Sequence, residues 1–126
     1  MEGSSKFFAE ELRLRTKAFA FEVLKLCRTL PETDEARIIG KQLLRAGMSV
    51  GANFRAVTRA RSSAEFISKL SVVIEETDET LFWLEAVSEN GILPKARVDP
   101  LLREADELVR ILAASQRTAR RTRTSY

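Results

Sequence analysis

The sequence contains no histidine and a single cysteine, Cys27, among its 126 residues. Without histidine the chain cannot form a Ser-His or Cys-His nucleophile pair, nor the Glu-x-x-His unit of di-iron helical bundles. One cysteine cannot make an internal disulfide or a paired-cysteine zinc site. The sequence also lacks a glycine-rich loop of the kind that binds phosphate. These observations predict that the protein is not an enzyme and holds no cofactor.

Carboxylates are the other groups that could support catalysis or bind a metal, and they gather in one part of the chain. Residues 75–89 hold six acids and no base, whereas residues 37–69 hold seven bases and one acid. Four of the acids offer the oxygen ligands that Mg²⁺ and Ca²⁺ prefer, namely Glu75, Glu76, Asp78 and Glu79. Successive helical residues point about 100° apart, so these carboxylates diverge around a helix and do not converge on one ion. We therefore expect no metal site.

The opposite charges of these two segments predict ion pairs between them. We expect some of the acids to pair with Arg45, Arg55 or Arg59, which fixes the register of helices within the bundle or between subunits; exposed pairs add little stability. Ser49 and Asn53 lie on or near an apolar stripe, so we interpret Asn53 as a structural hydrogen-bonding residue, with ligand binding as the alternative. The residues assigned to structural polar contacts or an interface are Arg45, Ser49, Asn53, Glu75, Glu76, Glu79 and Trp83.

Arginines in two regions could follow the phosphate backbone of a nucleic acid, since cations dominate such binding. Aromatic residues that could stack on bases are not interleaved with them. The alternative is that the arginines of the first region are engaged in ion pairs and that those of the second only make the protein more soluble. The candidate nucleic-acid-binding residues are Arg55, Arg59, Arg61, Arg117, Arg120, Arg121 and Arg123.

Four segments carry apolar residues three or four positions apart, which is the period of an amphipathic helix. Leu30-Pro31 ends the first segment, because the residue before a proline avoids helical ψ. Thr33 or Asp34 caps the second, a capping box at residues 62–65 starts the third, and Asn90-Gly91 ends it. Five glycines and three prolines are few, as in all-α proteins. The predicted helices span about residues 5–29, 34–60, 63–90 and 96–116.

Connections of only a few residues make neighbouring helices antiparallel, so residues 1–116 are predicted to form an all-α, up-down-up-down four-helix bundle. Glycines inside the second helix, at positions 40, 47 and 51, indicate close approach of another backbone or a kink near Gly51. Residues 117–126 contain four arginines and no acid, which predicts a basic, disordered tail. The third helix has more apolar positions than one face can hold, which predicts a subunit interface.

The sequence has no run of about 18 uncharged apolar residues and no signal peptide at its start. A single cysteine is compatible with a reducing compartment. We therefore expect a cytoplasmic protein without a membrane partner.

Several runs of the sequence resemble one bacterial family over residues 13 to 120: RTKAFA (15–20), QLLRAGMSVGANFRAV (42–57), RARSSAEFISKL (59–70), EETDETLFWLE (75–85) and EADELVRILAASQRTAR (104–120). They are similar to the proteins named four helix bundle proteins. That family is related to proteins encoded in intervening sequences of large-subunit ribosomal RNA genes and to the accessory variability determinant of diversity-generating retroelements. The resemblance implies a homopentamer with a central channel. Most members have no established biochemical activity, whereas the retroelement branch binds reverse transcriptase and nucleic acid.

The sequence and the resemblance together favour a non-catalytic homo-oligomeric scaffold or adaptor whose partner is itself. The alternative is an accessory protein that binds RNA or DNA through the arginines named above and accompanies a reverse transcriptase.

Overall fold

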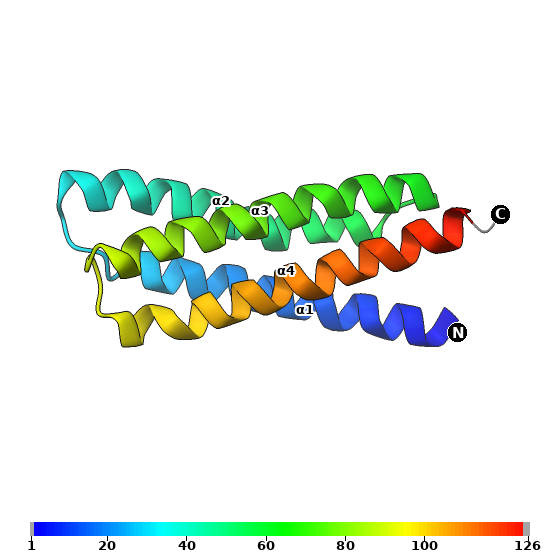
Figure 1. Ribbon diagram of the computed structural model, residues 1–126, viewed down its shortest axis with the longest axis horizontal. Helices are drawn as coiled ribbons and strands as arrows, with labels where there is room; N and C mark the ends of the chain where they lie inside the picture. Colours follow the sequence, from blue (N-terminus) through cyan, green and yellow to red (C-terminus); the bar gives the residue numbers. More distant parts are fainter. Residues whose placement is uncertain (1, 125–126) are drawn as a thin grey trace.

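The computed structural model describes the backbone of residues 2–124 and the side chains of residues 8–122. Four α-helices follow one another along this part of the chain, with no strand between them: α1 (Glu2–Cys27), α2 (Asp34–Thr58), α3 (Ser63–Glu89) and α4 (Lys95–Thr124). Figure 1 shows that each helix runs opposite to the one before it. The predicted all-α class and four-helix bundle topology are confirmed.

Side chains cap the starts of α2 and α3. The Thr33 hydroxyl accepts a hydrogen bond from the Ala36 amide at 3.2 Å, and the Ser62 hydroxyl accepts one from the Glu65 amide at 3.1 Å. Each hydroxyl thereby satisfies an amide that has no partner within its helix. At the other end of α3, Gly91 adopts a φ of 66°, the left-handed conformation that glycine accepts without strain.

The first two helices end two residues earlier than the predicted positions 29 and 60, because each closes with a tighter turn. The amides of residues 29 and 30 donate to carbonyls three residues earlier, at 2.9 and 3.2 Å. Those of residues 59 and 60 do the same, both at 3.2 Å. Bonds over three residues belong to a 3₁₀ turn, so the α-helix has already stopped.

The fourth helix departs most from the prediction. A disordered tail was expected from residue 117, but α4 continues to Thr124. Gln116 is 8% exposed. Its side-chain amide donates to the Ile67 carbonyl at 3.0 Å and to the Ser71 hydroxyl at 2.6 Å. These bonds hold α4 against α3 at the point where the apolar pattern stops. The following residues include alanine and several arginines, which favour the helix, and contain no glycine or proline.

Buried aliphatic and aromatic side chains from all four helices form one core, including Phe19 of α1, Leu43 of α2, Leu84 of α3 and Leu108 of α4. The close approach predicted from the glycines of α2 is confirmed. A Cβ atom on Gly51 would lie 3.2 Å from the Thr16 carbonyl oxygen of α1. Gly51 therefore lets the α1 and α2 backbones come together.

The four seams of the bundle are not equally tight. Along α1/α2, α2/α3 and α3/α4 the helices approach each other closely, whereas α1 and α4 approach much less. Within residues 2–124, every helix falls short of the combined length and apolar character needed to cross a membrane. The loose α1/α4 seam is the main irregularity of the bundle.

Candidate functional site

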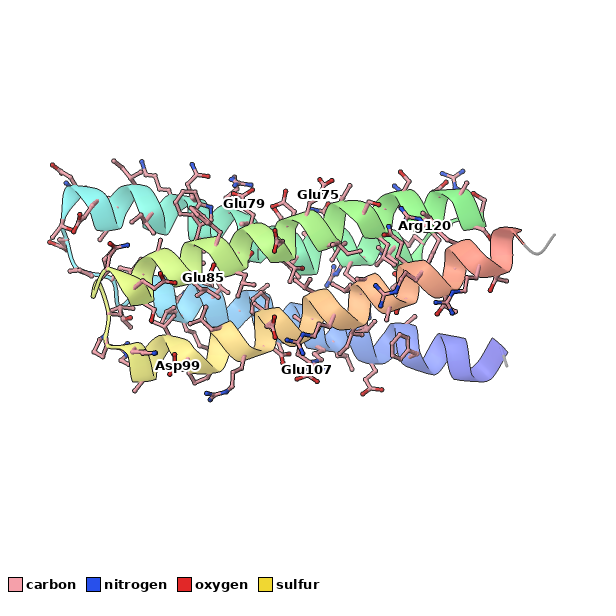
Figure 2. All side chains as sticks on the ribbon, viewed as in Figure 1. Glu75, Glu79, Glu85, Asp99, Glu107 and Arg120 are labelled. Atoms are coloured by element: carbon pink, nitrogen blue, oxygen red, sulfur yellow. The ribbon has the colours of Figure 1, made fainter. Side chains whose placement is uncertain are left out.

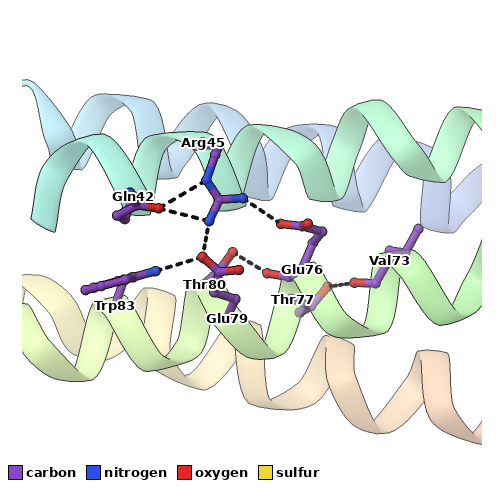
Figure 3. Close-up of polar contacts among 8 residues, drawn as sticks. All are labelled: Gln42, Arg45, Val73, Glu76, Thr77, Glu79, Thr80 and Trp83. Carbon is purple, nitrogen blue, oxygen red and sulfur yellow. Dashed lines mark hydrogen bonds and ion pairs between the residues drawn. The ribbon is translucent and has the colours of Figure 1, made fainter.

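Arg45 is the centre of a polar network between α2 and α3 (Figure 3). Its guanidinium donates to the Gln42 amide oxygen from two nitrogens at 3.1 Å, lies 3.4 Å from Glu76 Oε2, and also pairs with Glu79. The Trp83 indole donates to the same Glu79 oxygen at 3.0 Å. Arg45 thus forms the kind of ion pair expected between the basic and acidic segments. Because its side chain is 47% exposed, the network fixes helix register more than it stabilises the fold.

The other predicted polar contacts are not found among the described residues. Arg55 and Arg59 are exposed and make no ion pair with the acids of α3, because they lie near the end of α2, away from that cluster. Glu75 points outward from α3 without an ion pair (Figure 2). Ser49 and Asn53 are half-buried on α2 and their side chains make no hydrogen bond with any described residue. Water can satisfy groups at this depth, so the expected structural role of Asn53 is not seen within one protomer.

The buried polar side chains that do form hydrogen bonds were not identified from the sequence. Thr16 and Thr77 donate to the carbonyl four residues earlier in their own helices, at 2.8 and 2.7 Å, and Thr80 does the same at 2.7 Å. Gln116 joins α4 to α3, as described above. A threonine can satisfy its hydroxyl locally, so it occupies an apolar position without a partner that the sequence would reveal.

Apolar side chains project from the outer side of α2 and α3. Ile38 is 65% exposed, Phe82 58% and Val72 43%. The Phe82 ring packs edge-on against Trp83, with 5.0 Å between ring centroids. We call Ile38, Val72 and Phe82 the α2/α3 ridge. Large apolar groups exposed on a protomer often belong to an interaction surface.

The loose α1/α4 seam contains two hollows. The inner cavity, of about 580 Å³, is lined by Ala18, Phe19, Leu26, Pro100 and Leu101 among others. The outer cavity, of about 810 Å³, lies nearer the start of α1 and the end of α4, and its lining includes Leu12, Phe54, Phe66, Leu70 and Ile111. Cavities of this size and apolar character are able to accommodate ligand or partner side chains.

Arg15 separates the two cavities and lines both. Its guanidinium donates to both Glu104 carboxylate oxygens at 2.7 Å and lies 3.2 Å from Glu107 Oε2. The hydrogen bonds to Glu104 raise the pKa of Arg15 above its ordinary value, so the guanidinium stays charged at any ordinary pH. This clamp joins α1 to α4 across an otherwise open seam.

Replacing Arg15 with methionine is expected to lower the free energy of unfolding by about 1 kcal/mol, because a bidentate but partly exposed pair is lost. The loss should shrink in high salt. Urea unfolding at fixed protein concentration measures it. Arg13→Met is the matched control, since Arg13 pairs only with Glu10 on its own helix. Equal losses for the two variants would show that the clamp does not hold the seam.

Six exposed arginines gather at one end of the bundle. The end of α2, the turn that follows it and the end of α4 all lie there (Figure 1), and Figure 2 shows Arg120 on the last part of α4. We call this set the basic end: Arg55, Arg59, Arg61, Arg117, Arg120 and Arg121. Arg123 lies in α4, but its side chain falls outside the described residues. The fold therefore places at one end of the bundle two groups of arginines that are far apart in the sequence.

Cys27 is half-buried near the end of α1, and its thiol lies 3.8 Å from the Gly40 carbonyl oxygen. Burial raises the pKa of the thiol to about 11. We expect alkylation at pH 8 to be about a hundredfold slower in the folded protein than in urea, because only the thiolate reacts. Iodoacetamide labelling followed by mass spectrometry measures both rates. Similar rates would mean that the thiol is not shielded.

Within residues 8–122, acidic and cysteine side chains do not group in threes in a way that could hold a metal ion. The structural features available for function are therefore the α2/α3 ridge, the two α1/α4 cavities and the basic end.

The chain matches the family described as 23S rRNA-intervening sequence protein over residues 10–114. It is also similar to a solved structure, a protein with unknown function from the S23 ribosomal protein family of Bacteroides thetaiotaomicron VPI-5482. The two share 27% sequence identity with a TM-score of 0.79, and the match covers 86% of this chain and 97% of that one. No curated protein matches the chain. Because the family match spans most of the sequence and a relative has the same fold, the chain belongs to the 23S rRNA-intervening sequence protein family.

Proposed function

We propose that this protein is a non-catalytic scaffold or adaptor that works as a homo-oligomer, with a pentamer as its assembly. The observation that carries the proposal is the α2/α3 ridge, where large apolar side chains stand in solvent on one protomer. Burying such groups against sister copies contributes roughly 25 cal/mol for each Å² of apolar surface removed from water. The absence of histidine from the whole sequence supports a role without acid–base or nucleophilic catalysis.

Size-exclusion chromatography with light scattering on the wild-type protein tests this proposal. The protein concentration should be varied from about 1 to 100 μM, because association by mass action depends on concentration. We expect a mass several times that of one 14.2 kDa chain throughout the range. A protein that remains a monomer at the highest concentration would remove the basis of the proposal.

The basic end supports a second candidate function, namely binding of RNA or DNA in an accessory role beside a reverse transcriptase. Six arginines from α2, the following turn and α4 share one end of the bundle, and nucleic-acid backbones are bound chiefly through such cations. The exposed aromatic residues Phe21 and Phe82 lie far along the bundle from this end, whereas Phe8, which is 45% exposed, lines the outer cavity together with Thr118 and Ala119 and lies near the basic end.

Filter binding of duplex and single-stranded RNA and DNA to the wild-type protein tests this second candidate. We expect binding that weakens steeply between about 50 and 200 mM salt and depends little on base sequence. Absence of salt-sensitive binding to every probe would exclude it.

A further inference from the structure

The α2/α3 ridge and the α1/α4 cavities lie on opposite sides of the bundle. The helices follow one another around the bundle, so the seam between α2 and α3 is opposite the seam between α4 and α1 (Figure 1). Ile38, Val72 and Phe82 project from α2 and α3, and apolar hollows open between α1 and α4. One chain thus carries both a convex and a concave apolar surface.

We infer that the α2/α3 ridge of one copy docks into the α1/α4 cavities of the next copy. This inference rests on the proposed homo-oligomer and adds which two surfaces meet. Contacts between two different surfaces of the same chain are heterologous, so they continue from copy to copy and close into a ring when the rotation allows it.

The heights of the ridge and the cavities along the bundle match. Gln116 of α4 contacts Ser71 of α3, so the adjacent Val72 is level with Ser115, which lines the outer cavity. Phe82 lies about 15 Å further along α3, ten residues at 1.5 Å each. The same distance back along the antiparallel α4 reaches Ala105, which is next to Glu104, a residue that lines the inner cavity.

Ile38 also lies at the same height along the bundle as the inner cavity. Arg45 contacts Glu76 and Glu79, and Ile38 lies two helical turns before Arg45 on the antiparallel α2. Ile38 is therefore level with the part of α3 that contains Phe82 and Trp83. A neighbouring copy related by rotation about an axis parallel to the bundle can insert Phe82 and Ile38 into the inner cavity and Val72 into the outer one without sliding along the bundle.

Charge also favours a second copy as the occupant. Asp78 and Glu85, one helical turn before and after Phe82, are exposed and form no ion pair with a described residue. Arg97 lines the inner cavity, is exposed, and likewise forms no ion pair with a described side chain. Docking Phe82 into this cavity brings Glu85 of one copy toward Arg97 of the next. Such complementarity orients an interface and suppresses other partners.

Two single substitutions at exposed positions test the pairing. Phe82→Asp places a charge on the ridge, and Ala18→Arg fills the mouth of the inner cavity with a long side chain. Both positions are exposed on the protomer, so we expect each variant to keep the helix content of the wild type by circular dichroism. We also expect each variant alone to be a 14.2 kDa monomer by light scattering.

A mixture of the two variants gives the decisive result. The Phe82→Asp chain keeps intact cavities and the Ala18→Arg chain keeps an intact ridge, so one productive contact remains. Equal amounts should form a heterodimer of 28.4 kDa, twice 14.2 kDa, and nothing larger. Phe21→Asp is the matched control, because Phe21 is exposed on α1 but lines neither cavity, and this variant should assemble like the wild type.

The outcomes separate the inference from the proposed function. A monomeric wild type would overturn both. An assembled wild type together with a mixture that stays monomeric, or with single variants that still assemble, would overturn the ridge and cavity pairing alone. Disassembly by Phe21→Asp but not by Phe82→Asp would likewise place the interface elsewhere.

Discussion

Gly47→Val is expected to destabilise the protein by about 3 kcal/mol, the upper range for an overpacked core position. A Cβ atom at position 47 would lie 2.6 Å from Val23 Cγ1 and 2.9 Å from Val23 Cβ. The Cβ of Val23 is fixed to its backbone, so α1 and α2 must move apart to accept any side chain. Urea unfolding followed by circular dichroism, at fixed protein concentration, measures the loss.

Gly40→Ala is the control for this prediction. A Cβ atom at position 40 would approach only Leu30 Cδ1, at 2.8 Å, which is the flexible end of a side chain and can rotate away. Removing a helical glycine then contributes up to about 1 kcal/mol of stability. The two glycine substitutions should therefore change stability in opposite directions. A Gly47→Val variant as stable as the wild type would contradict the tight α1/α2 packing.

Replacing all six arginines of the basic end with glutamine is expected to weaken nucleic-acid binding by at least about a thousandfold at 0.1 M salt. If each arginine neutralises one phosphate, the slope of log affinity against log salt concentration should flatten by about five. Filter binding at several salt concentrations measures both quantities. Glutamine keeps the length and helix propensity of the side chain, so the bundle should remain folded.

Replacing three arginines at a time identifies which helix end carries the binding. One variant has glutamine at residues 55, 59 and 61, and the other has glutamine at residues 117, 120 and 121. If both groups of arginines contact one ligand, each variant should lose about half of the slope of log affinity against log salt concentration. Replacing Lys25, Arg37 and Arg110, which pair with acids of their own helices and are not part of the basic end, removes the same number of charges as each of these variants and supplies the control. An unchanged salt slope in the six-arginine variant would contradict the assignment.

Local features of the bundle could be predicted because their causes lie within a few residues. Thr33 and Ser62 cap helices through amides three residues ahead, and Gly91 takes the left-handed turn that ends α3. Apolar spacing gave the helices and most of the core. The glycines of α2 indicated a close neighbour, and Gly51 does face the backbone of α1.

Features that depend on distant partners could not be predicted in the same way. Gln116 extends α4 by bonding to Ile67 and Ser71, forty-five or more positions away, and a glutamine at the end of an apolar pattern gives no sign of this. The sequence predicted partners for Arg55 and Arg59 from opposite charge alone. It could not show that the register of the helices brings only Arg45 of these three arginines to the acids of α3.

The open α1/α4 seam is likewise a property of the assembled helices. The apolar stripes of α1 and α4 are regular, and nothing in their spacing distinguishes this seam from the other three. At this seam the long side chains of Arg15 and Glu104 form an ion pair between residues 89 positions apart in the sequence. Surplus apolar residues on α3 predicted an interface, and the structure shows that Val72 and Phe82 of this helix are exposed.

Trp83 is the only tryptophan of the chain and lies against Phe82 on the α2/α3 ridge, so its exposure to solvent reports directly whether another copy covers this surface. Quenching of its emission by acrylamide should be compared between the wild type and Ile38→Asp, which leaves the Phe82 and Trp83 pair in place. We expect markedly weaker quenching in the wild type at about 10 μM, and we expect this difference to disappear on dilution to the concentration at which light scattering shows single chains. Equal quenching of an assembled wild type and a monomeric Ile38→Asp variant would contradict the claim that sister copies bury the ridge.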